Sequence, residues 1–299
     1  MARLVRYSVL SFLIAASCCA WLSMGARVVT AGSFHGVVTE DGPALKSLHA
    51  GDLPPQAHAV VLPPQAHAFG KSYGEWGAAW WKWALSFPYA TNPIFDATGQ
   101  YGSQGQDQIP WFLAGNGGGT SIRSISIPCG RPVFFPLISF ENDYPCPDPT
   151  FQPAPGQSLR DFLTAGVTPI IDMVDALSAQ VDGVSIPNLR SYRATSGLDY
   201  FTGDPSLTST FDACITGSRQ AFVTDGYWLM LAPLTPGRHT LHFSSGISAF
   251  GFAVDVTYHI TVQAGHKMEA DASLSGDAAS TVAPTPVSGS WGRLKVLYR

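Results

Sequence analysis

Residues 252–262 have an apolar side chain at every second position and polar side chains between them from Asp255 onward, and this alternation constrains the fold more than any other feature of the sequence. Successive side chains of a β-strand point to opposite faces, so the segment predicts a strand with one buried face and one face in water. The chain's 30 glycines and 23 prolines provide turns on either side of such strands. Further strands are predicted at residues 110–113, 121–127, 132–138, 220–231 and 238–244.

Several short strands separated by turns indicate a mainly β fold. We expect an antiparallel two-sheet sandwich, a jelly roll being one form of it, with a Trp-rich N-terminal helix and a second helical insertion. A ferredoxin-like or other α+β arrangement is the alternative. Apolar residues make up 45% of the chain and charged residues 13%, which is enough core for such a domain and excludes a wholly disordered chain.

Two segments carry helix signals. Ser72 and Glu75 have the spacing of a capping box, in which each side chain satisfies a backbone N–H at the helix start, and Pro88 ends this helix. The second helical region begins at Ser158, and Pro169 is predicted to break it and to start a new helix. The apolar face of that new helix carries Ile170, Ile171, Val174 and Leu177.

The N-terminus predicts export from the cell. Arg3 and Arg6 precede an uncharged, largely apolar stretch at residues 7–24, the pattern of a secretory signal peptide. Cleavage after Gly25 or Ala31 would leave small residues at the positions that signal peptidase reads. We therefore expect a secreted or periplasmic protein.

Two alternatives to cleavage stay open: an uncleaved membrane anchor, and a lipoprotein attached through Cys18. Proline-rich and Ser/Ala/Thr-rich composition on either side of the predicted strands indicates segments without a core of their own. The expected organisation is a signal peptide at 1–31, a Pro/His-containing linker at 32–68, a β-rich domain at 69–264 and a flexible tail at 265–299.

Three cysteines remain after removal of the signal peptide, and an oxidising compartment favours one disulfide among them. Cys129 and Cys146 flank a predicted strand, and ten strand residues cover roughly 33 Å. Bridged Cα atoms lie within roughly 7 Å of each other, so the strand between Cys129 and Cys146 keeps these two apart. Cys146 and Cys214 both lie in loop-like surroundings, and we expect them to form the disulfide. Three buried thiols are the alternative.

The charge balance excludes one class of partner. The net charge is −4 and no long basic run is present, so we expect no nucleic-acid partner. Membrane contact is expected only through the N-terminal segment if it stays uncleaved. The sequence also lacks a Gly-x-Ser-x-Gly elbow, a His-Glu-x-x-His motif, a phosphate-binding glycine loop and a Cys-x-x-Cys pair.

Three motifs are distributed along the predicted domain: Tyr-Gly-Glu-Trp at 73–76, Trp-Phe-Leu-Ala-Gly at 111–115 and Asp-Gly-Tyr-Trp at 225–228, the last followed by Pro-Gly-x-His at 236–239. In these motifs the chain resembles a group of bacterial secreted proteins without an established activity. The resemblance covers most of the predicted domain. It implies export and a bacterial origin, and it supplies no catalytic residues.

The tryptophans of the first helix are candidate ligand-binding residues. Trp76, Trp80 and Trp83 share one helical face, and aromatic rings stack on the C–H faces of sugars. Glu75 beside them is a candidate general acid. A tryptophan row at helical spacing is also typical of a buried core, and this alternative stays open.

Acidic residues follow the predicted strand at 132–138. Glu141 and Asp143, with Asp148 further on, are expected in a loop, where they would form an acid/base pair or bind Ca²⁺. We expect no resident cofactor, Ca²⁺ being the one ion that this loop could take. A solvated turn is the alternative.

Histidines on the C-terminal strands give a weaker metal hypothesis. His239 and His242 are three residues apart and so face opposite ways, His239 toward the core. His242 could gather with Asp255 and His259 on the polar face, and Asp143 is a further candidate ligand. Ordinary cross-strand ion pairing is the alternative.

Two functions follow from these patterns. The favoured one is a non-catalytic binding protein of the cell envelope or extracellular space, with a carbohydrate or cell-surface ligand. The alternative is a secreted polysaccharide hydrolase or lyase that uses Glu75, Glu141 and Asp143 for acid/base chemistry. Folds of this class host both roles, so the site has to decide.

Overall fold

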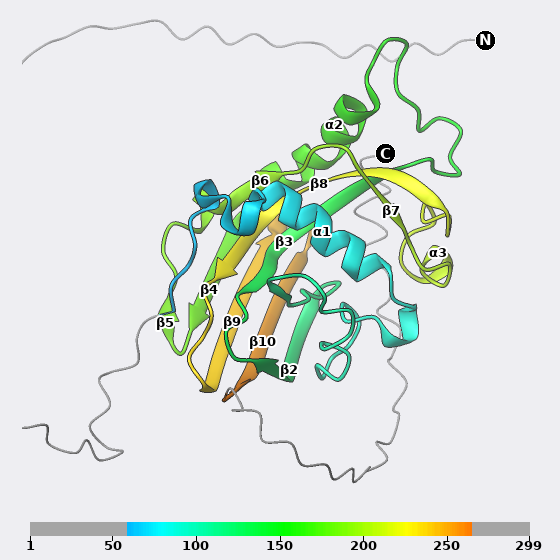
Figure 1. The fold of residues 1–299 in the computed structure, drawn as a ribbon. Coiled ribbons are helices and arrows are strands. Elements are labelled where there is room, and N and C mark those ends of the chain that lie inside the picture. Colours follow the sequence, from blue (N-terminus) through cyan, green and yellow to red (C-terminus); the bar gives the residue numbers. More distant parts are fainter. Residues whose placement is uncertain (1–58, 265–299) are drawn as a thin grey trace, which may run out of the picture. The chain divides into compact units, whose positions relative to one another are not determined.

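A computed structural model describes residues 59–264, and the predicted signal peptide, tail and most of the predicted linker lie outside this range. The described chain is mainly β and contains two five-stranded sheets (Figure 1). Sheet A consists of β1 (Trp111–Phe112), β3 (Val133–Tyr144), β8 (Arg219–Leu231), β6 (Arg193–Thr195) and β7 (Asp199–Thr202). Sheet B consists of β2 (Gly119–Pro128), β10 (Phe252–Gln263), β9 (Gly237–Ile247), β4 (Ala176–Val181) and β5 (Val184–Ser185).

Both sheets are mixed, so the expected antiparallel sandwich is only partly confirmed. β1 pairs with β3 and β2 pairs with β10 in parallel, whereas the other pairs are antiparallel. Parallel neighbours need a long crossover connection, and here the chain builds β3, β6, β7 and β8 of sheet A between β2 and β10. Alternation identified β10 as a strand, but alternation carries no information about which strand lies beside it.

The Trp-rich helix forms as predicted. α1 (Tyr73–Leu85) begins after Ser72, whose side chain accepts a hydrogen bond from the Glu75 N–H while the Glu75 carboxylate accepts one from the Ser72 N–H. The helix lies across sheet A and contacts β3, β6, β7 and β8 (Figure 1). Gly77 permits this approach, because a Cβ there would come within 2.8 Å of the Trp228 indole.

Sheet A has a hydrophobic core on each of its faces. One core lies under α1 and includes Phe134 and Trp228, whose rings stack 5.4 Å apart. The other core joins sheet A to sheet B, through contacts such as the one between Phe135 and Phe243, and extends under α2 (Leu159–Asp172). Sheet A is therefore an inner layer, and alternate residues of β3 and β8 serve two different cores.

α2 corrects one expectation. Pro169 lies inside the last turns of a single helix, and it does not start a second one. Pro169 has no N–H, so the helix loses one hydrogen bond at this position. The helix nevertheless continues to Asp172, and the next two residues, Ile170 and Ile171, are buried in the core. The chain then enters β4, which contains Leu177. The following Asp182–Gly183 pair has the positive φ angles, 53° and 78°, of a tight hairpin turn.

Ordered contacts begin inside the stretch expected to be a linker. The N–H of Leu62 donates to the carbonyl of Met230, and the N–H of Ala232 donates to the carbonyl of Val60, so this stretch pairs with the end of β8. Shorter helical elements are η1 (Pro64–Ala66), η2 (Ala68–Gly70), η3 (Tyr89–Thr91), η4 (Leu189–Tyr192), α3 (Leu207–Thr210) and η5 (Ser248–Phe250). Within residues 59–264, no helix is long and apolar enough to cross a bilayer.

Candidate functional site

The three candidate tryptophans of α1 are buried. Trp76 and Trp80 are each 2% exposed and Trp83 is 7% exposed. Each indole N–H donates to a backbone carbonyl, and the acceptors are Ala68, Leu113 and Gln104 respectively. Sugar stacking needs an open ring face, so the expected aromatic platform is not present at these residues. Their apolar surface instead packs α1 onto sheet A.

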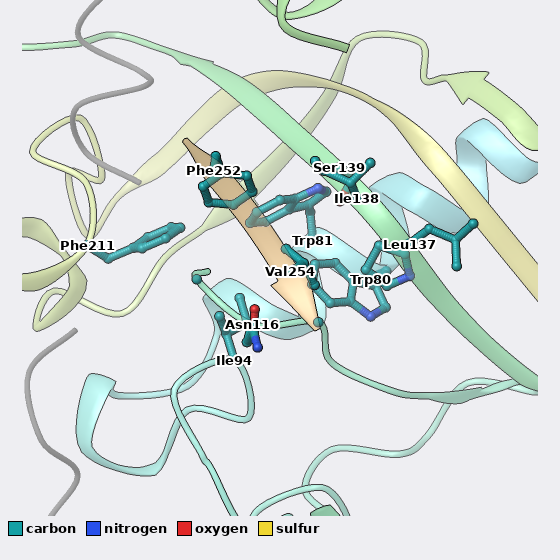
Figure 2. A pocket seen from close by; sticks show the side chains of 13 residues that line it. Trp80, Trp81, Ile94, Asn116, Leu137, Ile138, Ser139, Phe211, Phe252 and Val254 are labelled. Carbon is teal, nitrogen blue, oxygen red and sulfur yellow. The ribbon is translucent and has the colours of Figure 1, made fainter. Parts of the chain in front are cut away.

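A small cavity lies beside these tryptophans, between α1, β3 and β10. Trp80, Trp81, Phe211 and Phe252 contribute aromatic walls, with Asn116 as a polar group (Figure 2). The cavity volume is about 30 Å³. Such a space holds a water molecule, whereas ligand pockets usually measure roughly 300–1,000 Å³. This cavity therefore offers no room for a sugar.

Glu75 stands apart from the other candidate carboxylates. It is exposed in the first turn of α1, and its carboxylate accepts hydrogen bonds from the N–H and the hydroxyl of Ser72, both at 2.7 Å. These hydrogen bonds lower the pKa of Glu75, because they favour the charged form. A general acid needs the opposite shift, so its geometry supports helix capping.

Glu141 and Asp143 lie within strand β3, where a loop was expected. The strand continues to Tyr144 because β8 pairs with it along its whole length. Their side chains are buried and meet Asp212, which the sequence did not indicate. One carboxylate oxygen from each of the three residues lies within 4.8 Å of the others. The expected neighbour Asp148 remains exposed and hydrogen-bonds Thr150.

Two features hold this group of carboxylates together. The amide of Gln220 donates to Asp143 at 2.9 Å and to the Cys214 carbonyl at 2.8 Å. The Cys146–Cys214 disulfide, which was predicted, joins the segment that carries Asp212 to the end of β3. The spacing of Asp212 and Cys214 is therefore the signal that could have located the third carboxylate.

Oxygen ligands in such a group could hold a hard cation such as Ca²⁺ or share a proton. Ca²⁺ usually takes six to eight oxygen ligands. None of the three carboxylates lines the cavity of Figure 2 or the groove described below. The three side chains are buried in the protein and contribute to neither hollow.

The histidines divide between the two faces of sheet B, as predicted. His239 is buried, and its Nδ1 lies 2.7 Å from an Asp182 oxygen. His242 lies on the outer face, with its Nε2 3.5 Å from an Asp255 oxygen. His259 is also on the outer face, but in residues 59–264 no metal-type group combines it with His242 and Asp255. Asp143 belongs to the other sheet, so the four candidate ligands do not form one site.

The outer face of sheet B contains a polar groove of about 470 Å³. The strand register brings its side chains into two rows. In one row His259 of β10 lies between two hydroxyl residues, and in the next row Thr261 lies between a hydroxyl and a guanidinium. The exposed side chains of these rows are Ser124, His259 and Thr240, then Ser126, Thr261 and Arg238.

No family model, curated protein or solved structure matches this chain. Its function therefore has to be argued from the site itself. The groove is larger than the cavity beside α1 and has more polar residues along it, and that cavity is smaller than a ligand. Sequence reasoning named His259 only as a metal candidate, because the parallel pairing with β2 that completes the rows was not predictable.

Proposed function

We propose that this protein is an exported, non-catalytic binding protein that holds a carbohydrate on the outer face of sheet B. The observation that carries the proposal is the polar groove of about 470 Å³ on β2, β9 and β10. Serine and threonine hydroxyls, an imidazole and a guanidinium line it, and these groups match the hydroxyls of a sugar by hydrogen bonding. Because the groove lies on a regular sheet, the spacing between these side chains is fixed.

Binding is favoured over hydrolysis because the groove has no carboxylate among its lining residues. Glycosidic hydrolysis commonly needs two carboxyl groups roughly 5–10 Å apart on either side of the scissile bond. Glu141 and Asp143 are buried in sheet A, and Glu75 caps a helix. The carboxylates that a hydrolase or lyase would use therefore do not face a common substrate site.

Export is supported by two independent features. Arg3 and Arg6 precede an apolar stretch of signal-peptide type. The Cys146–Cys214 disulfide fits an oxidising compartment such as the periplasm or the extracellular space. Fractionation of the producing cells tests this part: the protein is expected outside the cytoplasm, and a reduced cytoplasmic pool would contradict it.

The binding proposal is tested with a panel of soluble polysaccharides and the purified protein. Calorimetry measures binding, and a reducing-end assay on the same samples measures hydrolysis. We expect heat of binding without new reducing ends. Thr261→Trp fills the centre of the groove and should abolish binding, whereas the control Thr120→Trp adds the same ring to the same sheet face roughly 20 Å away along β2.

Loss of binding in both variants, or in neither, would contradict a site in the groove. New reducing ends that disappear in Glu141→Gln would favour the hydrolase instead. Binding by no polysaccharide in the panel would reject the carbohydrate proposal.

A further inference from the structure

The groove is lined by basic residues and by no acidic residue. Arg238 and His259 are its exposed ionisable residues, and among residues 59–264 neither has a carboxylate partner. The carboxylates closest to these two residues on the paired strands already have other partners. Asp182 binds His239 and the N–H of Thr240, and Asp255 pairs with a different histidine. The groove therefore carries the positive charge of Arg238, although the whole chain has a net charge of −4.

The two basic residues are diagonal neighbours. His259 is opposite Thr240, and Arg238 is opposite Thr261, which follows His259 by two residues on the same face of β10. Diagonal neighbours on adjacent strands lie roughly 7–8 Å apart, so both basic side chains can reach one anionic group between them. A planar guanidinium also donates two parallel hydrogen bonds to a carboxylate, sulfate or phosphate.

Hydroxyl groups surround this pair of basic residues. Ser124 and Ser126 on β2, with Thr240 and Thr261, occupy the other positions of the two rows. A ligand with a single anionic group and neighbouring hydroxyls would satisfy both kinds of residue. Nucleic acid fits poorly, because the groove offers few basic groups for a phosphate backbone and no Phe, Tyr or Trp ring for base stacking.

We propose that the groove on the outer face of sheet B recognises an acidic sugar unit of a glycan, in which Arg238 and His259 contact the anionic group. This inference rests on the proposed carbohydrate-binding function and specifies its ligand class. The anionic group is a carboxylate, sulfate or phosphate, since all three match the same donors.

The test compares glycans that differ only in charge. Calorimetry on the purified protein uses polygalacturonate with its methyl-esterified twin, dextran sulfate with dextran, and inorganic sulfate and phosphate alone. At least one acidic polymer should bind about tenfold or more tightly than its neutral twin, as expected for charge-assisted hydrogen bonds. Added salt should weaken this binding, because the groove is exposed.

Arg238→Gln should lower the affinity for the acidic polymer by about tenfold or more and leave the neutral twin unaffected. The control Arg160→Gln removes the same charge from the exposed surface of α2 and should change neither affinity. Arg238→Lys keeps the charge without the planar fork, and it should recover only part of the binding.

Two results would overturn the inference. Equal binding of acidic and neutral twins, unchanged in Arg238→Gln, would reject the acidic ligand while the proposed carbohydrate-binding function survives. Binding of phosphatidylglycerol vesicles that depends on Arg238, without binding of any glycan, would reject both and assign the groove to a lipid surface. Correct folding of each variant is checked by its unfolding midpoint.

Discussion

Sheet A and sheet B present opposite kinds of surface. Sheet A is covered on both faces, by α1 on one side and by sheet B and α2 on the other, and it carries the large aromatic residues. The outer face of sheet B carries exposed serine, threonine, arginine and histidine side chains. The aromatic residues that suggest ligand binding in the sequence therefore build the core, and short polar residues build the candidate site.

Substitution of Trp228 in sheet A is expected to change the free energy of unfolding most, compared with a substitution on the outer face of sheet B. It is fully buried, stacks on Phe134 and lies under Gly77. Trp228→Ala should lower the free energy of unfolding by about 3–5 kcal/mol, because it leaves a cavity in the core under α1. His259→Ala on the outer face of sheet B should change it by less than about 0.5 kcal/mol. Urea unfolding of both variants measures the difference, and equal effects would contradict the comparison.

The buried ion pair between Arg193 and Asp225 contributes to the stability of sheet A, in contrast to the exposed polar side chains on the outer face of sheet B. Asp225 is fully buried and contacts Arg193 at 2.7 Å, and this carboxylate is the main cause that raises the pKa of Arg193. Arg193→Met should cost about 3–5 kcal/mol, because Asp225 would be buried without its counter-charge. The second partner of Arg193, Asp172, is 57% exposed.

The control Asp172→Asn should therefore cost less than about 1 kcal/mol. The double variant Arg193→Met with Asp225→Asn removes both charges and should recover much of the lost stability. Chemical unfolding of the three variants provides the comparison. A double variant no more stable than Arg193→Met would show that the loss comes from packing and not from the buried charge.

The disulfide tests how firmly the segment that carries Asp212 is held on sheet A. Cys146 and Cys214 are 68 residues apart in sequence. Replacing both by serine should lower the free energy of unfolding by about 2–4 kcal/mol, because the unfolded chain is then less constrained. Cys129→Ser is the matched control, since Cys129 is exposed and unbridged. A destabilisation by Cys129→Ser as large as by the double replacement would reject the assigned pairing.

The smallest expected effect concerns the start of α1. Ser72→Ala removes the capping hydroxyl and should cost about 1 kcal/mol. The folded-state pKa of Glu75 is lowered by its hydrogen bonds to Ser72, so its charged form stabilises the folded protein above the ordinary carboxyl pKa. This contribution is lost as the pH falls through the lowered pKa.

Glu75→Ala should therefore destabilise the protein at pH 7 and have a smaller effect in strong acid. Unfolding midpoints across this pH range measure the dependence. If the stability difference between Glu75→Ala and the unmodified protein grew as the pH falls, the capping role of Glu75 would be contradicted.

The sequence predicted features that depend on local spacing. The alternation in β10, the capping box of α1 and the Cys146–Cys214 pair all follow from residues whose relations are short-range or geometrically restricted. The structure confirms all three. Each of these features can be derived without knowing which strands are neighbours.

Features that depend on strand pairing were not predictable. Glu141 and Asp143 looked like loop residues because strands rarely bury carboxylates, and only the full-length pairing of β3 with β8 explains their position. Ser124 reaches His259 through a parallel pair whose strands are separated by most of the domain. The candidate groove exists only in that register, which no local pattern specifies.

The most direct test of the account is amide chemical-shift mapping during titration of the purified protein with an acidic glycan that binds it. We expect shifts in the backbone amides of Ser124, Thr240 and His259. The indole N–H signals of Trp76, Trp80 and Trp83 should stay unchanged, because these rings are buried between α1 and sheet A. Shifts of those indole signals without shifts on β2, β9 and β10 would contradict the assignment of binding to the outer face of sheet B.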